Sequence, residues 1–600
     1  MTIKAPRISR RTFLASSAAV GGGLAIGINP FGGTQVVRAA DGSPEIGAWV
    51  VIRPDDTVVV RIARSEMGQG SLTGLAQMVA EELECNWSKV TTEYPTPGTN
   101  VARKRVWGDY GTGGSRGIRT SHDYVRKGGA AARIMLVQAA ADQWKVPVSE
   151  CVAANSVITH KPSGRKVTYG KVAEAAAKLE VPKEVPLKDP KDWKVIGKPL
   201  KRLDTADKVT GKQLYGIDLK LPGMLNAAIK DAPVFGSKVK SFDADKAMAM
   251  KGVKKVMKVR DTAVAVVADS WWQAKLALDA MTIVWDEGDN AKVSSASIAK
   301  ILEEGLTAEQ AFVHNQNGDA KAALAGPGKK VEAVYSYPYQ NHAPMEPLNA
   351  TALYTPDRCQ VWVGTQNGEA ALAAAAEASG LPVGKCDVNK MLLGGGFGRR
   401  GFTDYVTQAV VIAKEMPGTP VKLLWSREED MAQGRYHPIM HAKLSAALDS
   451  SGNIAGMHIR LSGQSILAHA RPAALDKGKD PFTFQGLWPT GEHSLEYEIP
   501  NLLVDHAMRN PHVPPGFWRG VNINQNAIFL ECFVEELAEA AGQDALEFRR
   551  KMLQKHPQSL AVLNAVAEKG GWGKPAPAGR FRGLANFRAF GSYVAACAEI

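Results

Sequence analysis

The sequence predicts a mixed α+β fold, with α/β layers spread over several domains. Three observations carry this prediction. The chain has 600 residues, more than a single hydrophobic core normally holds. Short apolar runs of strand type alternate with Ala-rich helical stretches, which is typical of layered sheets and helices. The 58 Gly and 33 Pro against 7% aromatic residues indicate many turns and argue against a fibre, a coiled coil or a disordered chain.

Residues 1–39 have the pattern of an export signal. Residues 9–14 read S-R-R-T-F-L, a twin-arginine motif, and a weakly apolar stretch follows from 15 to 28. That stretch has about 14 residues, short of the ~20 that cross a bilayer. Residues 37–39, V-R-A, are a candidate cleavage site; a disordered basic tail is the alternative. Because the twin-arginine pathway carries folded proteins, we expect a periplasmic protein that takes up its cofactor before export.

The formal net charge of +13 raises the question of an anionic partner. Five Lys or Arg and no acidic residue lie in residues 1–39, so the rest of the chain carries +8. No Lys/Arg tract and no basic–aromatic interleaving is present, which argues against nucleic-acid binding. The six Cys form no CxxC pair and no cluster. This spacing argues against a disulfide framework, a four-thiolate zinc site or an iron–sulfur centre within the chain.

The segment 40–180 is expected to form the first domain. Residues 49–52 and 58–62 are apolar runs on either side of a Pro-Asp-Asp turn, which predicts a β-hairpin. The periodicity of apolar residues predicts a helix over 73–84 and a longer, Ala-rich helix over 121–145.

Four further segments follow along the chain. Residues 181–201 are rich in Pro and Lys with little periodicity, which predicts a linker. Residues 202–286 form a second domain that contains the apolar strand 263–267. A polar, Ala-rich bridge is expected over 287–328, and a third domain over 329–600, where strands and helices alternate.

The most informative segment is residues 393–401, L-G-G-G-F-G-R-R-G. A strand is predicted before it, over 387–393, and a helix after it, over 402–414. Glycines in such a place let backbone N–H groups approach an anionic ligand closely. Residues 396–401 also satisfy G-x-G-x-x-G, and 421–425 could supply the second strand of a dinucleotide-binding βαβ motif. A plain tight turn is the other alternative.

Other glycine-containing or aromatic loops precede helices or follow strands. Each of them alone is typical of an ordinary loop. They are E-M-G-Q-G at 66–70, G-G-S at 113–115, G-T-Q at 364–366 and P-G-F-W-R-G at 515–520.

Together these motifs resemble the molybdenum-binding large subunit of the xanthine dehydrogenase/aldehyde oxidase family, and within it the isoquinoline 1-oxidoreductase beta-subunit type. Residues 204–211, D-T-A-D-K-V-T-G, resemble the opening of the family's a/b hammerhead domain, which implies that 202–286 is this domain. Residues 341–347, N-H-A-P-M-E-P, and 394–398 resemble signatures of its molybdenum-binding domain. W-S-R-E-E-D-M at 425–431 matches the segment that follows.

The resemblance implies a molybdopterin cofactor, in the cytosine dinucleotide form, and no direct metal ligand from the protein. It places Gln366 at an oxo ligand of Mo and Arg519 in the substrate pocket, where it could stabilise negative charge. The remaining implied contacts fall into three groups. They are Gly395, Gly396, Phe397 and Gly398 against the inner sphere of the metal, Gly68, Gln69 and Gly70 at the pterin, and Gly113, Gly114 and Ser115 near its pyrophosphate or cytosine end.

Three histidine and glutamate positions leave two interpretations open. His342 and Glu346 have the residue types of an acid–base pair, and His437 lies in a further family motif. Satisfied structural roles are the favoured interpretation of all three.

The chain departs from the family pattern at three points. Gly401 stands where purine-oxidising relatives carry a carboxylate, which argues against xanthine as substrate. The G-Q-G motif at 68–70 precedes the hammerhead-like segment, an order that fits the isoquinoline-type subset. The family's catalytic Glu lies in a G-x-G-E motif that we do not find, and Glu599 lies outside any matching motif. The sequence is therefore expected to be a fragment or to lack the general base.

The resemblance implies a subunit that hydroxylates an N-heteroaromatic carbon or oxidises an aldehyde with water. Electrons would pass to a separate small subunit with two [2Fe–2S] clusters and then to a cytochrome. Two alternatives stand beside it. One is an NAD-dependent dehydrogenase, and the other is an inactive paralogue or scaffold that keeps cofactor-shaped loops.

Overall fold

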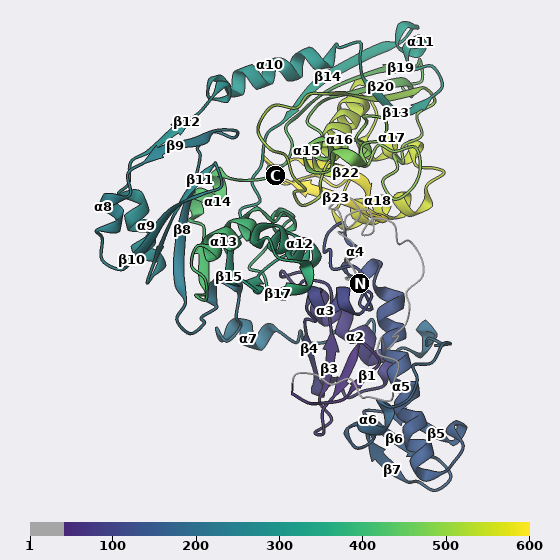
Figure 1. Ribbon diagram of the computed structural model, residues 1–600. Helices are drawn as coiled ribbons and strands as arrows, with labels where there is room; N and C mark the ends of the chain where they lie inside the picture. Colours follow the sequence, from purple (N-terminus) through teal and green to yellow (C-terminus); the bar gives the residue numbers. More distant parts are fainter. Residues whose placement is uncertain (1–40) are drawn as a thin grey trace, which may run out of the picture.

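The computed structural model describes residues 41–600 (Figure 1). The export signal predicted for residues 1–39 lies outside the described residues. In the part of the chain that is described, no helix is long and apolar enough to span a bilayer. The mixed α+β class predicted from the sequence is confirmed, because sheets of two to seven strands are layered with helices.

The segment 41–180 contains a four-stranded sheet and two long helices that pack on each other. In sheet order the strands are β1 (Glu45–Ile46), β2 (Val50–Ile52), β3 (Val58–Arg61) and β4 (Val90–Glu93); the helices are α2 (Ser71–Leu83) and α5 (His122–Trp144). The predicted hairpin and both predicted helices are confirmed. Gly129 permits the close helix packing, because a Cβ there would lie 2.5 Å from the carbonyl oxygen of Val79.

Smaller elements complete this segment. They are α3 (Pro97–Ala102), α4 (Arg116–Arg119), β5 (Cys151–Ala154), β6 (Val157–His160), β7 (Lys166–Thr168) and α6 (Tyr169–Ala176). Strands β5, β6 and β7 form a separate three-stranded sheet.

The predicted linker, residues 181–201, has irregular backbone but is fixed along α2. Glu81 is 1% exposed, and its Oε2 accepts hydrogen bonds from the N–H groups of Lys194 (2.8 Å) and Val195 (2.6 Å). A buried carboxylate requires such partners, so the contact holds the segment in place as well as satisfying the charge.

A seven-stranded sheet forms the central layer, and two predicted domains contribute to it (Figure 1). Its order is β10 (Val253–Val259), β11 (Ala263–Ala268), β8 (Leu225–Asp231), β18 (Val421–Leu424), β15 (Asn349–Thr355), β16 (Arg358–Val363) and β17 (Cys386–Lys390). Because β8 pairs in parallel with β18, the segments 202–286 and 329–600 share this sheet.

Helices cover both faces of the central sheet. One face, at β8 and β11, packs against α9 (Trp271–Asp279). The other face packs against α12 (Gly368–Ser379) and α13 (Asp404–Lys414). The segment 202–286 also contains α7 (Thr205–Val209), α8 (Asp245–Met248) and a two-stranded ribbon of β9 (Lys238–Phe242) and β12 (Ile283–Asp286).

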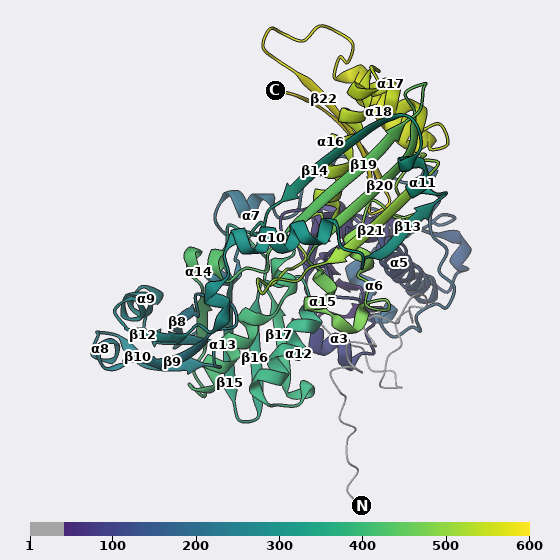
Figure 2. The same ribbon diagram turned by 90° about the horizontal axis from the view of Figure 1, so that it is seen from above.

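A five-stranded sheet forms the second large layer (Figure 2). Its order is β13 (Phe312–Asn317), β21 (Leu502–Met508), β20 (Ile454–Gly463), β19 (Met440–Leu448) and β14 (Lys329–Tyr337). One face packs against α16 (Ile523–Ala540), and α10 (Ser295–Leu306) and α11 (Ala320–Ala325) lie against the other. The predicted bridge, 287–328, therefore supplies an edge strand and two helices to this layer. Its polar composition reflects that position, because most of its side chains face solvent.

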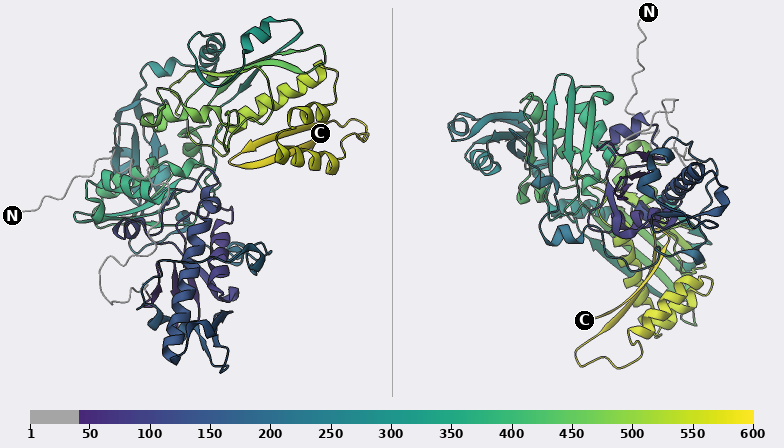
Figure 3. Two further views of the ribbon diagram at one scale, coloured as in Figure 1. Left: turned by 90° about the vertical axis from the view of Figure 1, so that its right-hand side faces the viewer. Right: turned by 90° about the horizontal axis from the view of Figure 1, so that it is seen from below.

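The last described elements pack beside α16 (Figure 3). They are α17 (Ala545–Met552), α18 (Pro557–Lys569) and a ribbon of β22 (Arg582–Ala589) and β23 (Ser592–Glu599). Glu599 lies on this ribbon, where Arg580 (3.1 Å) and Arg582 (2.9 Å) bind its carboxylate.

A buried pair of carboxyl groups joins β8 to the helix α14 (Arg427–Ala432). Oε1 of Glu429 accepts a hydrogen bond from the N–H of Asp231 at 2.6 Å, and Gln408 donates to the Asp231 carboxylate at 2.8 Å. Burial, together with the neighbouring negative charge, raises the pKa of Glu429 to about 8. Burial also raises the pKa of Asp231, to about 6.

This pair predicts that the fold loses stability as pH rises. Both groups bind protons more tightly in the folded chain than in the unfolded one, so the free energy of unfolding falls between about pH 4 and pH 8. Glu429→Gln keeps the hydrogen-bond acceptor but cannot ionise. We expect the free energy of unfolding of this variant to fall less than that of the unmodified chain between pH 5.5 and 8.5, by an amount on the order of 1 kcal/mol, and its Tm to fall less accordingly.

Thermal unfolding at several pH values measures the effect. The matched control is Glu428→Gln, on the same turn of helix but exposed to solvent. Parallel pH profiles for Glu429→Gln and the unmodified chain would contradict the prediction.

Candidate functional site

Loops from distant parts of the chain meet beyond the carboxyl ends of β16 and β17. The N-terminal segment packs against this edge of the central sheet through α3. Ser65 donates through Oγ to the carbonyl of Thr365 at 2.7 Å. The loops that meet are 64–70, 111–115, 364–367, 393–401 and 515–521.

Gln366 connects three of these loops through its side chain and backbone. The side chain is 5% exposed; Nε2 donates to the carbonyl of Thr112 (2.9 Å), and Oε1 accepts from the N–H of Gly398 (2.9 Å). The backbone carbonyl of Gln366 also accepts from the N–H of Thr112 (2.7 Å). Gln366 thus fixes the glycine-rich loop against the N-terminal segment. Its predicted contact with a metal ligand stays a prediction.

Steric crowding explains two glycines of the 393–401 loop. A Cβ at Gly396 would lie 2.6 Å from Oε1 of Gln366. A Cβ at Gly398 would overlap the carbonyl oxygen of Phe517, and φ at Gly398 is +109°. Among the residues that the structure describes, no protein acceptor pairs with the N–H groups of Gly395, Gly396 and Phe397. The loop therefore offers a row of free backbone donors at the site.

Two buried arginines, which the sequence analysis did not single out, hold the loop. Arg400 is 0% exposed; it donates to Glu346 (3.0 Å) and to the carbonyl of Gly395 (2.9 Å). Arg399 binds Asp404 through two bonds of 2.9 and 2.8 Å. Consecutive arginines directly after a glycine run were the available signal, because such charges need carboxylate partners once buried.

One carboxylate organises the Gly68-Gln69-Gly70 loop. Glu66 accepts hydrogen bonds from the N–H groups of Gly68 (2.8 Å) and Gly70 (3.0 Å). The side-chain amide of Gln69 is used within the same loop, where Nε2 donates to the carbonyl of Ser65 at 2.9 Å and to the hydroxyl of Ser71 at 2.8 Å. The predicted contact of Gln69 with a pterin stays a prediction, and it would require one of these bonds to be exchanged.

Gly113, Gly114 and Ser115 form an open, exposed turn. A Cβ at Gly113 would meet no atom within 4 Å, so this glycine is not required by crowding within the protein. Arg119 donates to the carbonyl of Gly114 (3.1 Å), and Arg116 to that of Gly113 (3.3 Å). The turn therefore lies beside cationic groups, which suits an anionic ligand.

Arg519 and Phe397 are brought together at the surface of the site. The guanidinium carbon of Arg519 lies 5.6 Å from the centroid of the Phe397 ring and 5.5 Å from that of Trp518. Phe397 is 37% exposed. An aromatic face and a cation side by side can bind a flat, electron-poor or anionic molecule.

The structure gives the predicted acid–base candidates structural roles. His342 donates through Nε2 to the carbonyl of Phe517 (3.2 Å), and burial lowers its pKa to about 3. Glu346 binds Arg400 and the N–H of Gly394 (2.8 Å) instead of His342. Burial also lowers the pKa of His437, whose Nε2 lies 2.8 Å from the carbonyl of Val521.

The G-x-G-x-x-G match over 396–401 does not have the geometry of a dinucleotide-binding turn. The following helix, α13, begins only at Asp404, and β15 and β16 separate β18 from β17 in the sheet. The third glycine of such a motif normally permits close packing of helix on strand. A Cβ at Gly401 would meet no atom within 4 Å. These observations contradict the dehydrogenase alternative.

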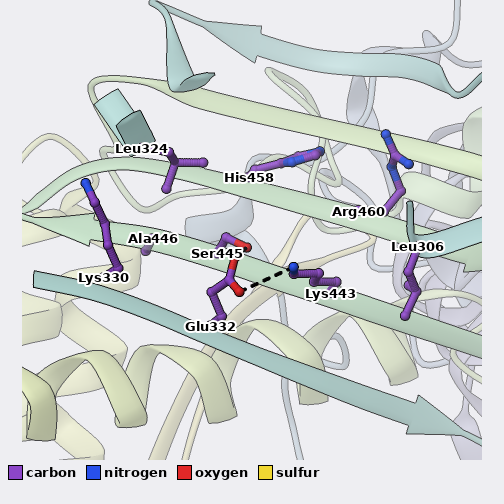
Figure 4. Close-up of a pocket in the computed structure, with 9 residues that line it drawn as sticks. All are labelled: Leu306, Leu324, Lys330, Glu332, Lys443, Ser445, Ala446, His458 and Arg460. Atoms are coloured by element: carbon purple, nitrogen blue, oxygen red, sulfur yellow. Dashed lines mark hydrogen bonds and ion pairs between the residues drawn. The ribbon is translucent and has the colours of Figure 1, made fainter. Parts of the chain in front are cut away.

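A cavity of about 290 Å³ lies elsewhere, on the face of the five-stranded sheet next to α10 and α11 (Figure 4). Its polar side chains are paired with one another or with neighbours. Glu332 lies 3.3 Å from Lys443, and Asp505 binds Arg460 at 2.6 Å. None of the residues that line the cavity belongs to the loops of the site.

Family models and curated relatives agree on the chain's relationship. Two models described as molybdopterin cofactor-binding domains match residues 4–216 and 302–553. The chain is 30% identical to the "membrane-bound aldehyde dehydrogenase [pyrroloquinoline-quinone]" of Gluconacetobacter polyoxogenes, over 94% of this chain and 77% of that protein. It is 28% identical to isoquinoline 1-oxidoreductase subunit beta of Brevundimonas diminuta, over 99% of this chain and 82% of the relative.

The fold has a counterpart among solved structures. Quinoline 2-oxidoreductase from Pseudomonas putida 86 superposes with a TM-score of 0.53 at 19% identity. The match covers 65% of this chain and 57% of the solved chain, so the chain spans little more than half of that structure. With these matches and the converging loops, the chain belongs to the xanthine dehydrogenase/aldehyde oxidase family of molybdopterin-binding large subunits.

Proposed function

We propose that the chain is the cofactor-binding subunit of a molybdenum hydroxylase that acts on an N-heteroaromatic compound, such as isoquinoline, or on an aldehyde. The observation that carries this proposal is the convergence of the five loops, three of which Gln366 connects. The names of two relatives, an isoquinoline oxidoreductase subunit and an aldehyde dehydrogenase, support the two substrate classes.

The residues of the site fit a molybdopterin group. The unpaired N–H groups of Gly395, Gly396 and Phe397 are donors without protein partners in the described chain. The crowding at Gly396 and Gly398 leaves no room for side chains in this cradle. We expect the 393–398 loop and Gln366 to hold the metal end of the cofactor, and the turn 113–115 its anionic end. When bound, such a cofactor supplies the two-electron oxidation of the substrate carbon.

The protein's own part in the reaction is binding and orientation. Phe397 and Arg519 present a flat apolar face beside a cation, which would align a planar substrate and stabilise negative charge on it. The neutral His342 holds the 515–521 loop through the carbonyl of Phe517, and so keeps Arg519 in place. Glu66 and Glu346, the buried carboxylates of these loops, are each bound by an arginine. Both carboxylates therefore serve to hold the loops in place.

We propose that electrons leave through a separate [2Fe–2S] small subunit and then a cytochrome. The relative from Brevundimonas is named as one subunit of its enzyme, which supports an assembly of several chains. The twin-arginine motif at 9–14 supports export to the periplasm.

Purified protein, co-expressed with its small subunit, tests the function. We expect about one molybdenum per chain, a cytosine nucleotide after acid release, and dye reduction with isoquinoline-type or aldehyde substrates. Extraction of pyrroloquinoline quinone in place of molybdenum would support a cofactor like the one in the Gluconacetobacter protein's name. Bound molybdenum and nucleotide without turnover would support the inactive-scaffold alternative.

The two glycines at the end of the glycine loop are expected to differ in their effect. Gly398→Ala would drive a methyl group into the carbonyl of Phe517, and this overpacking costs about 1–3 kcal/mol. We expect roughly a tenfold or greater loss of bound molybdenum per chain. Gly401→Ala is the matched control, since its position is open, and should retain molybdenum within about twofold. Equal losses in both variants would count against the assigned cradle.

Substitution of Arg519 is expected to affect turnover and not cofactor content. Arg519→Ala removes the cation beside Phe397, and we expect kcat/KM to fall about 10- to 100-fold. Arg519→Lys keeps the charge without the planar group, and its kcat/KM should lie between those of the unmodified chain and of Arg519→Ala. Molybdenum analysis of each variant is the control. Unchanged kcat/KM in Arg519→Ala would remove Arg519 from the substrate site.

A further inference from the structure

Two cysteines that are distant in sequence lie side by side in the central sheet. Cys359 in β16 and Cys386 in β17 are direct partners in the parallel strand pairing. Both side chains belong to the core cluster on the face covered by α12 and α13, so they point to the same side of the sheet. Neighbouring strands lie about 4.7–4.9 Å apart, within the Cα separation of about 4.4–6.8 Å that a disulfide spans.

The two thiols differ in their surroundings. The hydroxyl of Ser379 lies 3.6 Å from Sγ of Cys386. The interaction between the two thiols lowers the pKa of Cys386 and raises that of Cys359. Cys386 is thus the more acidic thiol of the pair, and a thiolate is the form that attacks a disulfide.

The pair lies at the start of both strands, close to the surface. β17 is the outermost strand on its side of the sheet, and Cys386, its first residue, is 5% exposed. Exposed Arg358 and Lys385 immediately precede the two cysteines. Strand ends open locally more readily than strand centres, so fraying of one or two residues would expose Sγ of Cys386.

The other cysteines lack this arrangement. Cys85 is buried next to the carbonyl of Ala80, and burial raises the pKa of its thiol to about 12. Cys532 is exposed, and partial desolvation together with the neighbouring carboxylates of Glu536 and Glu531 raises its pKa. In the described part of the chain, strand pairing places no other two cysteines opposite each other.

We propose that Cys359 and Cys386 form a redox-active dithiol that closes to an intramolecular disulfide in exchange with a disulfide-bearing oxidant, such as glutathione disulfide or a thiol–disulfide oxidoreductase. The Cys386 thiolate attacks the oxidant's S–S bond, and one oxidant sulfur leaves as a thiolate that takes up a proton. Cys359 then loses its proton and attacks Sγ of Cys386, which expels the second oxidant sulfur. Two protein thiols are oxidised by two electrons, and one oxidant disulfide is reduced to two thiols.

Closure would tie together the two strands that carry the site. β16 leads into the loop 364–367 and β17 into the loop 393–401, so the disulfide would fix the register of both strands. The inference does not depend on the cofactor or on the reaction proposed above.

Redox titration of the full chain tests the inference. The protein is equilibrated in glutathione buffers of increasing potential, free thiols are alkylated, and peptides are identified by mass spectrometry without reduction. We expect a peptide pair joined through Cys359 and Cys386, reversed by dithiothreitol, and a rise in Tm of a few degrees in the oxidised form. Alkylation of Cys386 should begin at a lower pH than that of Cys359.

Cysteine variants test whether Cys359 and Cys386, and not another cysteine, form the disulfide. Cys359→Ser and Cys386→Ser should each abolish the joined peptide and the oxidation-dependent shift in Tm, while Cys85→Ala, the matched buried control, should keep both. The inference is overturned if fully oxidising buffer leaves Cys359 and Cys386 as free thiols while exposed Cys532 becomes glutathionylated. This measurement needs only the unmodified chain, so it decides the question even if a serine variant does not fold.

Discussion

The buried ion pair between Arg400 and Glu346 is the contact on which the site depends. Arg400 is 0% and Glu346 7% exposed, so each charge needs the other. The Glu346 carboxylate also accepts hydrogen bonds from the N–H groups of Gly394 (2.8 Å) and of Ile217 (3.0 Å), which lies in the neighbouring segment. The carbonyl of Arg400 accepts the N–H of Gln366 (3.0 Å). One desolvated pair therefore fixes the glycine loop, the glutamine loop and the junction between two segments.

The same design recurs at the N-terminal side of the site. Glu66 is 1% exposed, binds two N–H groups of the Gly-Gln-Gly loop and pairs with Arg202 at 3.0 Å. The glycine loop 393–401 and the Gly68-Gln69-Gly70 loop are thus each shaped by one buried carboxylate and one arginine that come from different parts of the chain. Such anchoring leaves other backbone N–H groups of the glycine loop unpaired and fixed in direction, which is what binding of a large polar group requires.

Local sequence patterns predicted the regular elements well. The Ala-rich helix expected over 121–145 is α5, His122–Trp144, and the hairpin around Pro54 is formed by β2 and β3. The loops around Gly68, Gly113, Gln366 and Gly396 were found as motifs, because close approach of backbone to a ligand favours glycine. The roles of Glu66 and Arg400 were not found, since Arg202 and Glu346, their partners, are far away in the sequence. The role of Arg399 was not found either, although its partner Asp404 is only five residues away. The polar stretch 287–328 was interpreted as a bridge because an exposed edge strand has little apolar signal.

The sequence by itself determined the fold class, the main helices, the glycine-rich loops and the resemblance to molybdopterin-binding subunits, because these depend on residues near one another in the chain. Strand order decided the rest. It placed β15 and β16 between β17 and β18, which contradicts a dinucleotide-binding motif that the residues 396–401 alone would satisfy. It also paired Cys359 with Cys386, although the six cysteines look scattered in the sequence. Hydrogen bonds between strands form across long sequence separations, and no local pattern specifies which strands become neighbours.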